Sequence, residues 1–454
     1  MSTKELILAG DTLLTMDARN TVIGNGALLV RDGRIAAVGP LAQVTAAHPT
    51  VAIRRVAHSV LMPGLINAHA HSGLLRGTAE NLSLWDWLRL HIDPMHRVLQ
   101  PHEAEVASRL CYAESALGGT TTVVDMWRFM EGSARAAEAI GTRLVAVPYV
   151  GAHPDYDYFD TLDMNEALIQ GWHRKAGGRI NVWVGLEHPF YTDEAGQRRA
   201  FEMANRYGTG LHTHCSESQV EVPEFVKRYG KRPMCVLEEL GYFATPRTLI
   251  AHAVWLDAAE IQLLARQRVA VAHCPVSNMK LASGFAPVAE LLSAGVPVGI
   301  GTDGEKENNN FDMFEEMKIA SLLGKIRTLD ATAMDSWQVL RMATTLGARA
   351  LGLDHEIGSL EVGKRADVIA VRTDTPRMTP LFAAGPYFNV QHNLVHAVQG
   401  HDVRLTMVEG RVLAEDGVLV GSDLQEILAE VQRAAPGLFA RRAAYLAQAN
   451  LRGP

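Results

Sequence analysis

Paired cysteines, basic clusters and long apolar runs are all scarce in this chain of 454 residues. The four cysteines, Cys111, Cys215, Cys235 and Cys274, are widely spaced and form no C-x-x-C pair. This spacing argues against a disulfide framework and favours a reducing, cytoplasmic location. No stretch approaches the roughly 18 consecutive apolar residues of a membrane-spanning helix, so we expect no membrane partner. Residues 1–14 also lack the apolar core and cleavage site of a secretory signal.

The charge of the chain points away from polyanionic partners. Its formal net charge is −7, from 43 basic and 50 acidic residues, and the sequence contains no basic run. We therefore expect no nucleic-acid partner, because proteins that bind nucleic acids carry basic patches. A small-molecule substrate, neutral or cationic, is compatible with this charge.

The apolar residues, 48% of the chain, fall into a repeating pattern. Short and nearly continuous apolar runs alternate with segments that carry apolar residues at helical spacing. Such runs are typical of parallel strands buried on both faces. Their number and spacing predict an α/β protein with a (β/α)8 TIM barrel rather than an open sheet. The apolar runs are 60–67, 120–125, 143–150, 180–187, 209–214, 248–252, 269–273 and 296–303, and the helical segments are 101–118, 194–207, 221–240, 257–267 and 311–324.

The two ends of the chain predict strands of another kind. The first segment contains short alternating strands with a hairpin turn at Asp32-Gly33. The last segment returns to similar strands and then carries helical spacing over residues 422–448. We therefore predict three segments. Residues 1–59 and 353–454 build one small β-sandwich with a C-terminal helix, and residues 60–352 form the barrel.

Metal-binding residue types stand where the predicted barrel strands end, which is where TIM barrels place catalytic groups. His69 and His71 are two residues apart, so both imidazoles project from one face of a strand and suit a zinc-like cation. His214 and Asp303 would complete three imidazoles and one carboxylate, leaving one metal position open for water with a pKa of about 7. A lone His-x-His is more often a pair of buried histidines, and Asp303 in Gly-Thr-Asp-Gly is typical of a turn.

Five further residues near strand ends are candidates for catalysis, binding or support of the site. Glu217, three residues after His214, can carry a proton from water to the substrate, although a solvated loop glutamate is the plain alternative. His252 can hold the water or polarise the attacked group. His188 can contact the substrate. His212 lies deeper than His214 and fits a supporting role, while His273 is as compatible with structure as with function.

These motifs jointly resemble the amidohydrolase superfamily. The similar branch contains S-adenosylhomocysteine and methylthioadenosine deaminases, cytosine and guanine deaminases, and triazine hydrolases of the atrazine chlorohydrolase type. The resemblance covers nearly the whole chain and implies hydrolysis of a carbon–nitrogen bond that is not a peptide bond. Relatives are commonly dimers or tetramers, so we expect a homodimer or homotetramer. The matching segments are PGLINAHAH, LHTHCSE, LIAHAVWLD, VAHCPVSNMKLASGFAPV, GIGTDG and NNNFDMFEEMK.

The resemblance also implies a role for each site residue. It assigns the metal to His69, His71, His214 and Asp303, and the proton shuttle to Glu217. Asp303 would also accept a hydrogen bond or a proton from the water, His252 would contact the water and the substituent of the attacked carbon, and His188 would bind the substrate. The fourth run has no lysine to bridge two metals, so we expect one divalent ion. Glu187, in the same run, leaves a two-metal alternative open, because a glutamate that points inward could bridge two metals. Zinc is the first expectation, and Fe, Co or Mn are compatible with the same ligands.

The substrate-binding segments depart from adenosine-type deaminases. Where those enzymes place a glutamate on the ribose, this chain has His96, and the loop after Asp303 carries Glu305-Lys306-Glu307. We expect Trp85, His96, Trp127, His188 and Asn309 to contact the substrate, with Arg128 beside Trp127 available to stack on a planar ligand. Simple packing is the alternative for Trp127.

Three hypotheses about function follow. The first is that metal-activated water displaces ammonia from an amino-substituted purine, pterin, pyrimidine or triazine. The second keeps the machinery and changes the leaving group to an alkylamine, a halide, or the amine of a urea or carbamate. The third is a metal-free binding or assembly protein, which the complete ligand set disfavours.

Overall fold

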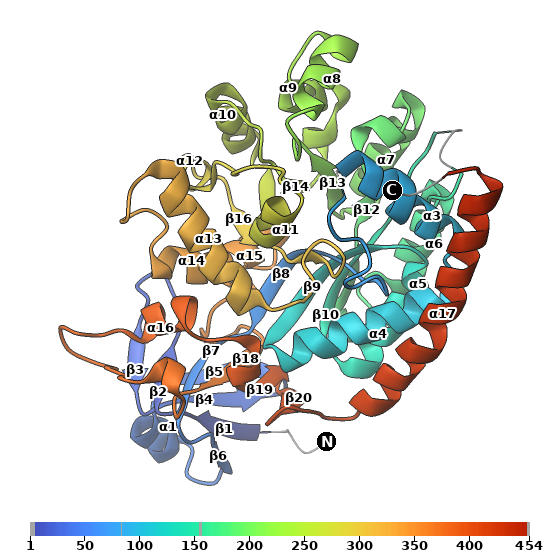
Figure 1. Cartoon of the computed structure of the whole chain (residues 1–454). Coiled ribbons are helices and arrows are strands. Elements are labelled where there is room, and N and C mark those ends of the chain that lie inside the picture. Colours follow the sequence, from blue (N-terminus) through green and yellow to red (C-terminus); the bar gives the residue numbers. More distant parts are fainter. Residues whose placement is uncertain (1–4, 83, 154–156, 452–454) are drawn as a thin grey trace.

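The computed structural model describes residues 5–82, 84–153 and 157–451, with the side chains of Leu84 and Trp85 excepted. The fold is α/β and is built around two five-stranded parallel sheets (Figure 1). The first has the order β11-β10-β9-β8-β17. Its strands are β8 (Leu65–His71), β9 (Thr120–Trp127), β10 (Arg143–Pro148), β11 (Ile180–Val182) and β17 (Asp303–Gly304).

The second parallel sheet has the order β12-β13-β14-β15-β16. The fourth and eighth predicted runs each contribute to both sheets, because β11 and β12 flank Trp183, and Gly301-Thr302 separates β16 from β17. Consecutive runs are therefore neighbours throughout, and β17 returns to pair with β8. The strands of this sheet are β12 (Val184–Gly185), β13 (Leu211–Cys215), β14 (Thr248–His252), β15 (Ala270–His273) and β16 (Val298–Ile300).

The first predicted run, 60–67, is wrong as a single strand. It spans the end of β7 (Ser59–Pro63) and the start of β8, which belong to different sheets. The chain changes sheet at Gly64, where a Cβ atom would lie 2.2 Å from the Thr121 side chain. The predicted boundary between residues 59 and 60 thus falls inside β7, and His69 and His71 lie within β8 rather than after it.

Both ends of the chain contribute to a seven-stranded sheet of order β21-β20-β19-β18-β7-β2-β3, next to a four-stranded sheet of order β5-β4-β1-β6. The two sheets share an apolar cluster that includes Leu8, Leu61 and Leu405. The predicted turn at Asp32-Gly33 joins β4 to β5 as an antiparallel hairpin, and both residues have positive φ. The strands are β1 (Glu5–Ala9), β2 (Thr12–Leu14), β3 (Val22–Gly24), β4 (Gly26–Arg31), β5 (Arg34–Pro40), β6 (Ile53–Arg55), β18 (Val368–Arg372), β19 (Val403–Val408), β20 (Arg411–Glu415) and β21 (Val418–Leu419).

Helices cover the outside of the parallel sheets (Figure 1). The segment predicted as one helix over 221–240 is two helices, because Gly230 has a φ of +70° and Pro233 starts the second. The first helices are α1 (Leu41–Ala47), α2 (Leu84–Trp87), α3 (Asp93–Val98), α4 (Pro101–Leu117), α5 (Met130–Ile140), α6 (Leu162–Trp172), α7 (Glu194–Tyr207), α8 (Glu221–Tyr229) and α9 (Pro233–Leu240). The later ones are α10 (Ala258–Gln267), α11 (Pro275–Lys280), α12 (Val288–Ser293), α13 (Met313–Thr328), α14 (Ser336–Met342), α15 (Thr345–Leu351), α16 (Val390–His396) and α17 (Leu424–Gln448).

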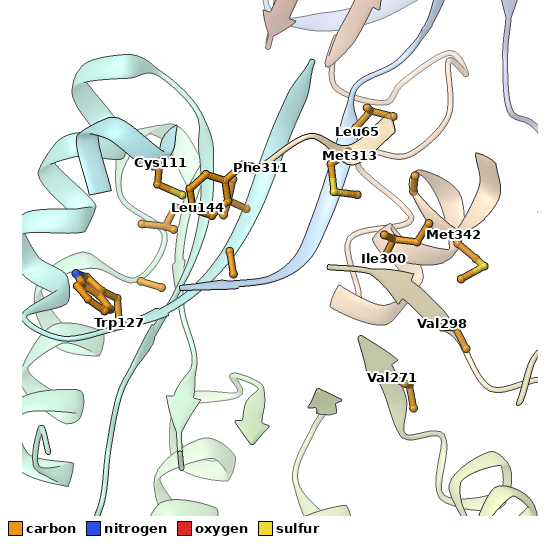
Figure 2. Packing of buried hydrophobic residues seen from close by; sticks show 14 of the residues in the cluster. Leu65, Cys111, Trp127, Leu144, Val271, Val298, Ile300, Phe311, Met313 and Met342 are labelled. Atoms are coloured by element: carbon orange, nitrogen blue, oxygen red, sulfur yellow. The ribbon is translucent and has the colours of Figure 1, made fainter. Parts of the chain in front are cut away.

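The apolar core runs between these helices and the strands. Leu65, Leu144, Val271 and Val298, which are strand residues, belong to one apolar cluster with Phe311 and Met313, and Figure 2 shows these side chains. The C-terminal helix α17 lies against α3 and α4 on the outside of the molecule. Across the described residues, none of the helices has the length and apolar character needed to traverse a bilayer.

Candidate active site

Five buried side chains converge at the carboxyl ends of neighbouring strands. His69 and His71 come from β8, His214 from β13, His252 from the end of β14, and Asp303 from β17. Each is at most 6% exposed. Parallel strands end at the same edge of a sheet, so residues far apart in sequence meet there.

The converging atoms are the Nε2 nitrogens of three histidines and one carboxylate oxygen. His214 Nε2 lies 3.1 Å from His69 Nε2 and 3.2 Å from His71 Nε2. Asp303 Oδ1 lies 3.4 Å from His69 Nε2 and 3.3 Å from His71 Nε2. His214 Nε2 and Asp303 Oδ1 thus both lie close to the Nε2 atoms of His69 and His71.

Hydrogen bonds on the far side of each ring fix which nitrogen carries the proton. His71 Nδ1 lies 2.5 Å from the Met126 carbonyl oxygen, and His214 Nδ1 lies 2.7 Å from that of Glu187. A carbonyl oxygen only accepts, so both Nδ1 atoms carry the hydrogen. The Nε2 atoms of His71 and His214 therefore present lone pairs.

His69 Nε2 also presents a lone pair, because a second histidine, His212, accepts the hydrogen of His69 Nδ1. His212 Nδ1 donates to the Leu249 carbonyl at 2.8 Å, which leaves His212 Nε2 as an acceptor. His69 Nδ1 lies 2.8 Å from that nitrogen and donates to it. Burial lowers the pKa of His69, His71, His212 and His214, so all four rings are neutral.

This arrangement fits a divalent cation. The Nε2 atoms of His69 and His71 each lie 3.1–3.4 Å from His214 Nε2 and from Asp303 Oδ1, and no hydrogen lies between the nitrogens. Facing lone pairs repel one another unless a cation lies between them, and backbone or imidazole acceptors behind the rings are typical of metal ligands. The geometry groups His69 with His71 and His214, and His69 with His252 and Asp303.

Asp303 is held as an anion at this point. Burial pushes the pKa of Asp303 up, but the contact with the His69 ring and the charge of His252 bring it well below its usual range. Its second oxygen, Oδ2, accepts a hydrogen bond from Ser277 Oγ at 2.6 Å. Asp303 and His252 both have positive φ, a conformation that costs a non-glycine residue about 1–3 kcal/mol and often marks a functional site.

His252 and Glu217 face each other across the opening of the cluster. His252 Nε2 lies 3.8 Å from Glu217 Oε2 and 3.8 Å from Asp303 Oδ2. Its Nδ1 donates to Asn278 Oδ1 at 3.1 Å. Burial opposes the charge on His252, but Glu217 and Asp303 raise its pKa above the ordinary value. Burial also raises the pKa of Glu217.

Glu221, which the sequence did not single out, holds the turn that carries Glu217. Its carboxylate accepts the backbone N–H groups of Ser216, Glu217 and Ser218 at 2.6, 2.9 and 3.2 Å. His188 Nε2 lies 3.4 Å from Glu221 Oε2, and His188 Nδ1 accepts the N–H of Phe190 at 3.2 Å. Both ring nitrogens of His188 are therefore engaged within the protein.

A cavity of about 270 Å³ opens over the cluster. His96 forms part of its lining and stacks on Tyr149 with ring centres 4.6 Å apart and planes 4° from parallel. Glu217 and His188 also line it. The remaining lining mixes apolar and charged groups: Trp87, Leu88, Ile92, Phe190, Tyr191, Ser218, Val220, Leu281, Glu187, Glu221, Glu224, Arg228, Lys306 and Glu307.

Comparison with protein families decides the classification. The Amidohydrolase family matches residues 60–413. The chain belongs to the amidohydrolase family. A short segment of this amidohydrolase, residues 26–50, also matches an imidazolonepropionase-like composite domain of bacteria.

Curated relatives of this amidohydrolase are deaminases. A 5'-deoxyadenosine deaminase of Methanosarcina barkeri is 38% identical over 440 residues, covering 96% of this chain and 99% of that protein. A 5-methylthioadenosine/S-adenosylhomocysteine deaminase of Nitratidesulfovibrio vulgaris is 38% identical over 436 residues, covering 95% and 96%.

Solved structures show the same likeness. An adenosine deaminase of Xanthomonas campestris with bound zinc superposes with a TM-score of 0.89 at 32% identity, covering 96% of this chain and 98% of that chain. The zinc complex of atrazine chlorohydrolase from Arthrobacter aurescens superposes with a TM-score of 0.83 at 26% identity, covering 94% of this chain and 99% of that chain. This amidohydrolase is thus a hydrolase of non-peptide carbon–nitrogen bonds, and its His and Asp cluster makes it metal-dependent.

The other residues predicted to contact the substrate are Trp127, Asn309 and Trp85, and Trp127 and Asn309 do not line the cavity. Trp127 lies behind His96, with ring centres 5.3 Å apart, and donates its indole N–H to the Ala104 carbonyl at 3.3 Å. Asn309 is exposed and bonds Lys280 and Glu80 rather than lining the cavity. The side chain of Trp85 lies outside the described residues.

Arg128 and Glu187, near the cavity, both make polar contacts within the protein. Arg128 is buried, pairs with Asp160 at 2.8 Å and donates to the His96 carbonyl, so it supports the segment that carries His96. Glu187 Oε1 accepts a hydrogen bond from the Tyr149 hydroxyl at 3.3 Å and lies 3.7 Å from His214 Nδ1, and burial raises the pKa of Glu187 to about 7.

No motif in the sequence would have singled out Tyr149 or Glu221 as residues of the site. The charges of Lys306 and Glu307, by contrast, were visible in the sequence as a departure in the loop after Asp303.

Proposed function

We propose that this amidohydrolase deaminates an amino-substituted nitrogen heterocycle by hydrolysis, with zinc as its metal. The observation that carries the proposal is that His214 Nε2 and the Asp303 carboxylate each lie 3.1–3.4 Å from the Nε2 atoms of His69 and His71, with Glu217 close by. The deaminase relatives that match nearly the whole chain support it. We also infer that its two parallel sheets form one closed barrel, that the sheets at the chain ends form a sandwich, and that the protein is a cytoplasmic homodimer or homotetramer.

We assign the metal to His69, His71, His214 and Asp303. A divalent cation at this position supplies Lewis-acid activation that makes water nucleophilic near neutral pH. The zinc-bound relatives favour zinc. The ligand set by itself is also compatible with Fe, Co or Mn. The neutral rings of the three histidines are already in the tautomer that such binding needs.

We assign proton transfer to Glu217. Its raised pKa brings it nearer to neutrality, where a carboxyl group both accepts and returns a proton efficiently. Glu217 takes a proton from the attacking water and gives it to the ring nitrogen beside the amine-bearing carbon. The remaining hydroxyl proton then passes to the amine, so that the carbon–nitrogen bond breaks, ammonia leaves and a ring carbonyl forms. The charged His252 ring, 3.8 Å from Glu217, stabilises negative charge that develops on the attacked centre.

A second candidate keeps these residues and changes the leaving group. The structural likeness to atrazine chlorohydrolase favours it, since that protein's name describes the removal of a chloride from a triazine. Alkylamine, urea and carbamate substrates belong to the same candidate. Nothing in the ligand set distinguishes ammonia from these leaving groups, because the leaving group is held by the substrate pocket.

The test is a panel of aminated purines, pterins, pyrimidines and triazines, together with chlorotriazines and aryl ureas, given to zinc-loaded protein. Ammonia from at least one aminated heterocycle, lost with Glu217→Gln, is the expected result. Chloride or alkylamine release without ammonia would favour the second candidate. Protein that holds stoichiometric zinc and releases neither would refute both.

A further inference from the structure

The loop after Asp303 buries three consecutive charged residues. Glu305, Lys306 and Glu307 are 1%, 3% and 4% exposed. Glutamate and lysine are almost never fully buried unless they are paired, because removing a charge from water costs several kcal/mol. A buried run of this kind at the edge of a catalytic cavity therefore calls for a reason beyond packing.

Lys306 and Glu307 form an ion pair that faces the cavity. Lys306 Nζ lies 3.0 Å from Glu307 Oε1, and both residues line the cavity above the His and Asp cluster. A Cβ atom on Gly304 would lie 2.3 Å from Glu307 Oε2 and 2.8 Å from Lys306 Nζ. Both charged ends thus lie over Gly304, one residue after Asp303.

Glu305 has a different position, although it lies in the same loop. Its Oε1 accepts the backbone N–H of Leu75 at 2.6 Å, and its carboxylate fills the space above Gly73. It does not line the cavity. Glu305 therefore anchors the loop to the segment that follows β8, while the next two side chains turn toward the substrate space.

Flat aromatic surfaces lie near the ion pair. The Trp127 ring centre is 5.9 Å from Lys306 Nζ. His96 and Tyr149, stacked on each other, line the same cavity as the pair. A planar ligand in this cavity can therefore meet ring faces and the charged pair together.

The charge of the cavity selects against an anionic ligand. Its lining carries the acidic side chains of Glu187, Glu217, Glu221, Glu224, Asp303 and Glu307, against Lys306, Arg228 and the His252 ring. Lys306 is also already neutralised by Glu307. A neutral group that both accepts and donates a hydrogen bond is the better match.

We propose that Lys306 and Glu307 together recognise a lactam edge of the substrate, a ring carbonyl next to a ring N–H. Lys306 donates to the carbonyl oxygen, and Glu307 accepts from the N–H, so a neighbouring ammonium and carboxylate match the two groups in one plane. The inference rests on the proposed deaminase function and narrows it to amino-oxo heterocycles. The adenine ring, which has no oxo group, lacks this edge.

The test compares pairs of compounds that have the same leaving amine and differ in the lactam. Cytosine is compared with 4-aminopyrimidine, and isoguanine with adenine. Binding is measured by calorimetry on the zinc-loaded Glu217→Gln variant, so that affinity is independent of turnover. We expect each lactam to bind at least about 100-fold more tightly than its partner, because a site built around hydrogen bonds rejects a ligand that leaves them unmade. Equal or reversed affinities would overturn the inference.

The decisive variant is the double substitution Lys306→Met with Glu307→Gln, which removes both charges of the ion pair together rather than leaving one of its members unpaired. We expect it to bring the preference for each lactam down to about tenfold or less. Glu305→Gln is the matched control, since it changes a charge in the same loop away from the cavity, and it should keep the preference. A preference that survives the double substitution in correctly melting, zinc-containing protein would refute the assignment. Ammonia release by the wild-type protein tests the deaminase function separately.

Discussion

The carboxylate of Glu221 accepts the backbone N–H of Glu217 at 2.9 Å, so one buried acid holds the chain segment of another. The same carboxylate accepts the N–H groups of Ser216 and Ser218 and approaches His188 Nε2 at 3.4 Å. Ser216, at the start of this turn, has a φ of +55°. Glu221 thus compensates an unfavourable backbone conformation and sets the direction in which Glu217 projects.

We expect Glu221→Ala to lower kcat by about 10- to 100-fold with little change in KM, because a shift of about 1 Å in a catalytic group has an effect of this size. Glu221→Gln retains an acceptor oxygen and should lose less. Steady-state kinetics and melting temperature check both variants. Glu194→Gln, at the first residue of α7 as Glu221 is of α8, is the control. A rise in KM alone would assign Glu221 to substrate binding instead.

The His69–His212 contact predicts a role for His212 in metal affinity. His212→Phe removes the acceptor for His69 Nδ1–H, which fixes the orientation of that ring. We expect zinc to bind about 10- to 100-fold more weakly, the usual effect of losing a group that orients a metal ligand. Competition with a chromophoric chelator measures the affinity. Unchanged affinity would mean that β8 alone orients His69.

Removing the metal should destabilise the folded protein as well as inactivate it. The facing lone pairs of His69, His71 and His214 are favourable only around a cation. Binding to the folded state alone adds about 2.7 kcal/mol when free zinc is 100 times its dissociation constant. We expect the melting temperature to rise with zinc concentration and this dependence to weaken strongly in Asp303→Asn. A melting temperature insensitive to zinc in the wild-type protein would contradict the metal assignment.

His273 predicts a dependence of stability on pH. Burial lowers its pKa to about 3 in the folded protein, whereas an unfolded histidine titrates near 6.5. Between these values the unfolded chain binds the extra proton. The free energy of unfolding therefore falls by about 1.4 kcal/mol for each unit of acidification within this window. The stability is fully present above pH 6.5 and is lost toward pH 3.

Calorimetry of zinc-loaded protein at pH 7, 6 and 5 tests this slope. The melting temperature of the wild-type protein should fall more steeply than that of His273→Asn, which lacks the titrating group. Parallel curves for the two proteins would show that His273 takes up its proton in the folded state as easily as in the unfolded one.

The sequence by itself determined the residue types at the strand ends and the parallel α/β arrangement. A repeat of two residues places His69 and His71 on one face of β8 whatever the rest of the fold does. Apolar runs separated by helices require parallel strands, and parallel strands bring His214 and Asp303 to the same edge. The amidohydrolase family could be recognised from these residues for that reason.

Tertiary structure decided which nitrogen of each imidazole carries the proton and which charged side chains face the substrate cavity. The acceptors that fix His69, His71 and His214 belong to other strands or loops, so no local pattern announces them. Within one loop, Glu305 turns to Leu75 while Lys306 turns to the cavity, and only the packed neighbours separate the two. Spacing along a chain fixes the direction of side chains within one element, whereas distances between elements follow from the order and packing of the sheets.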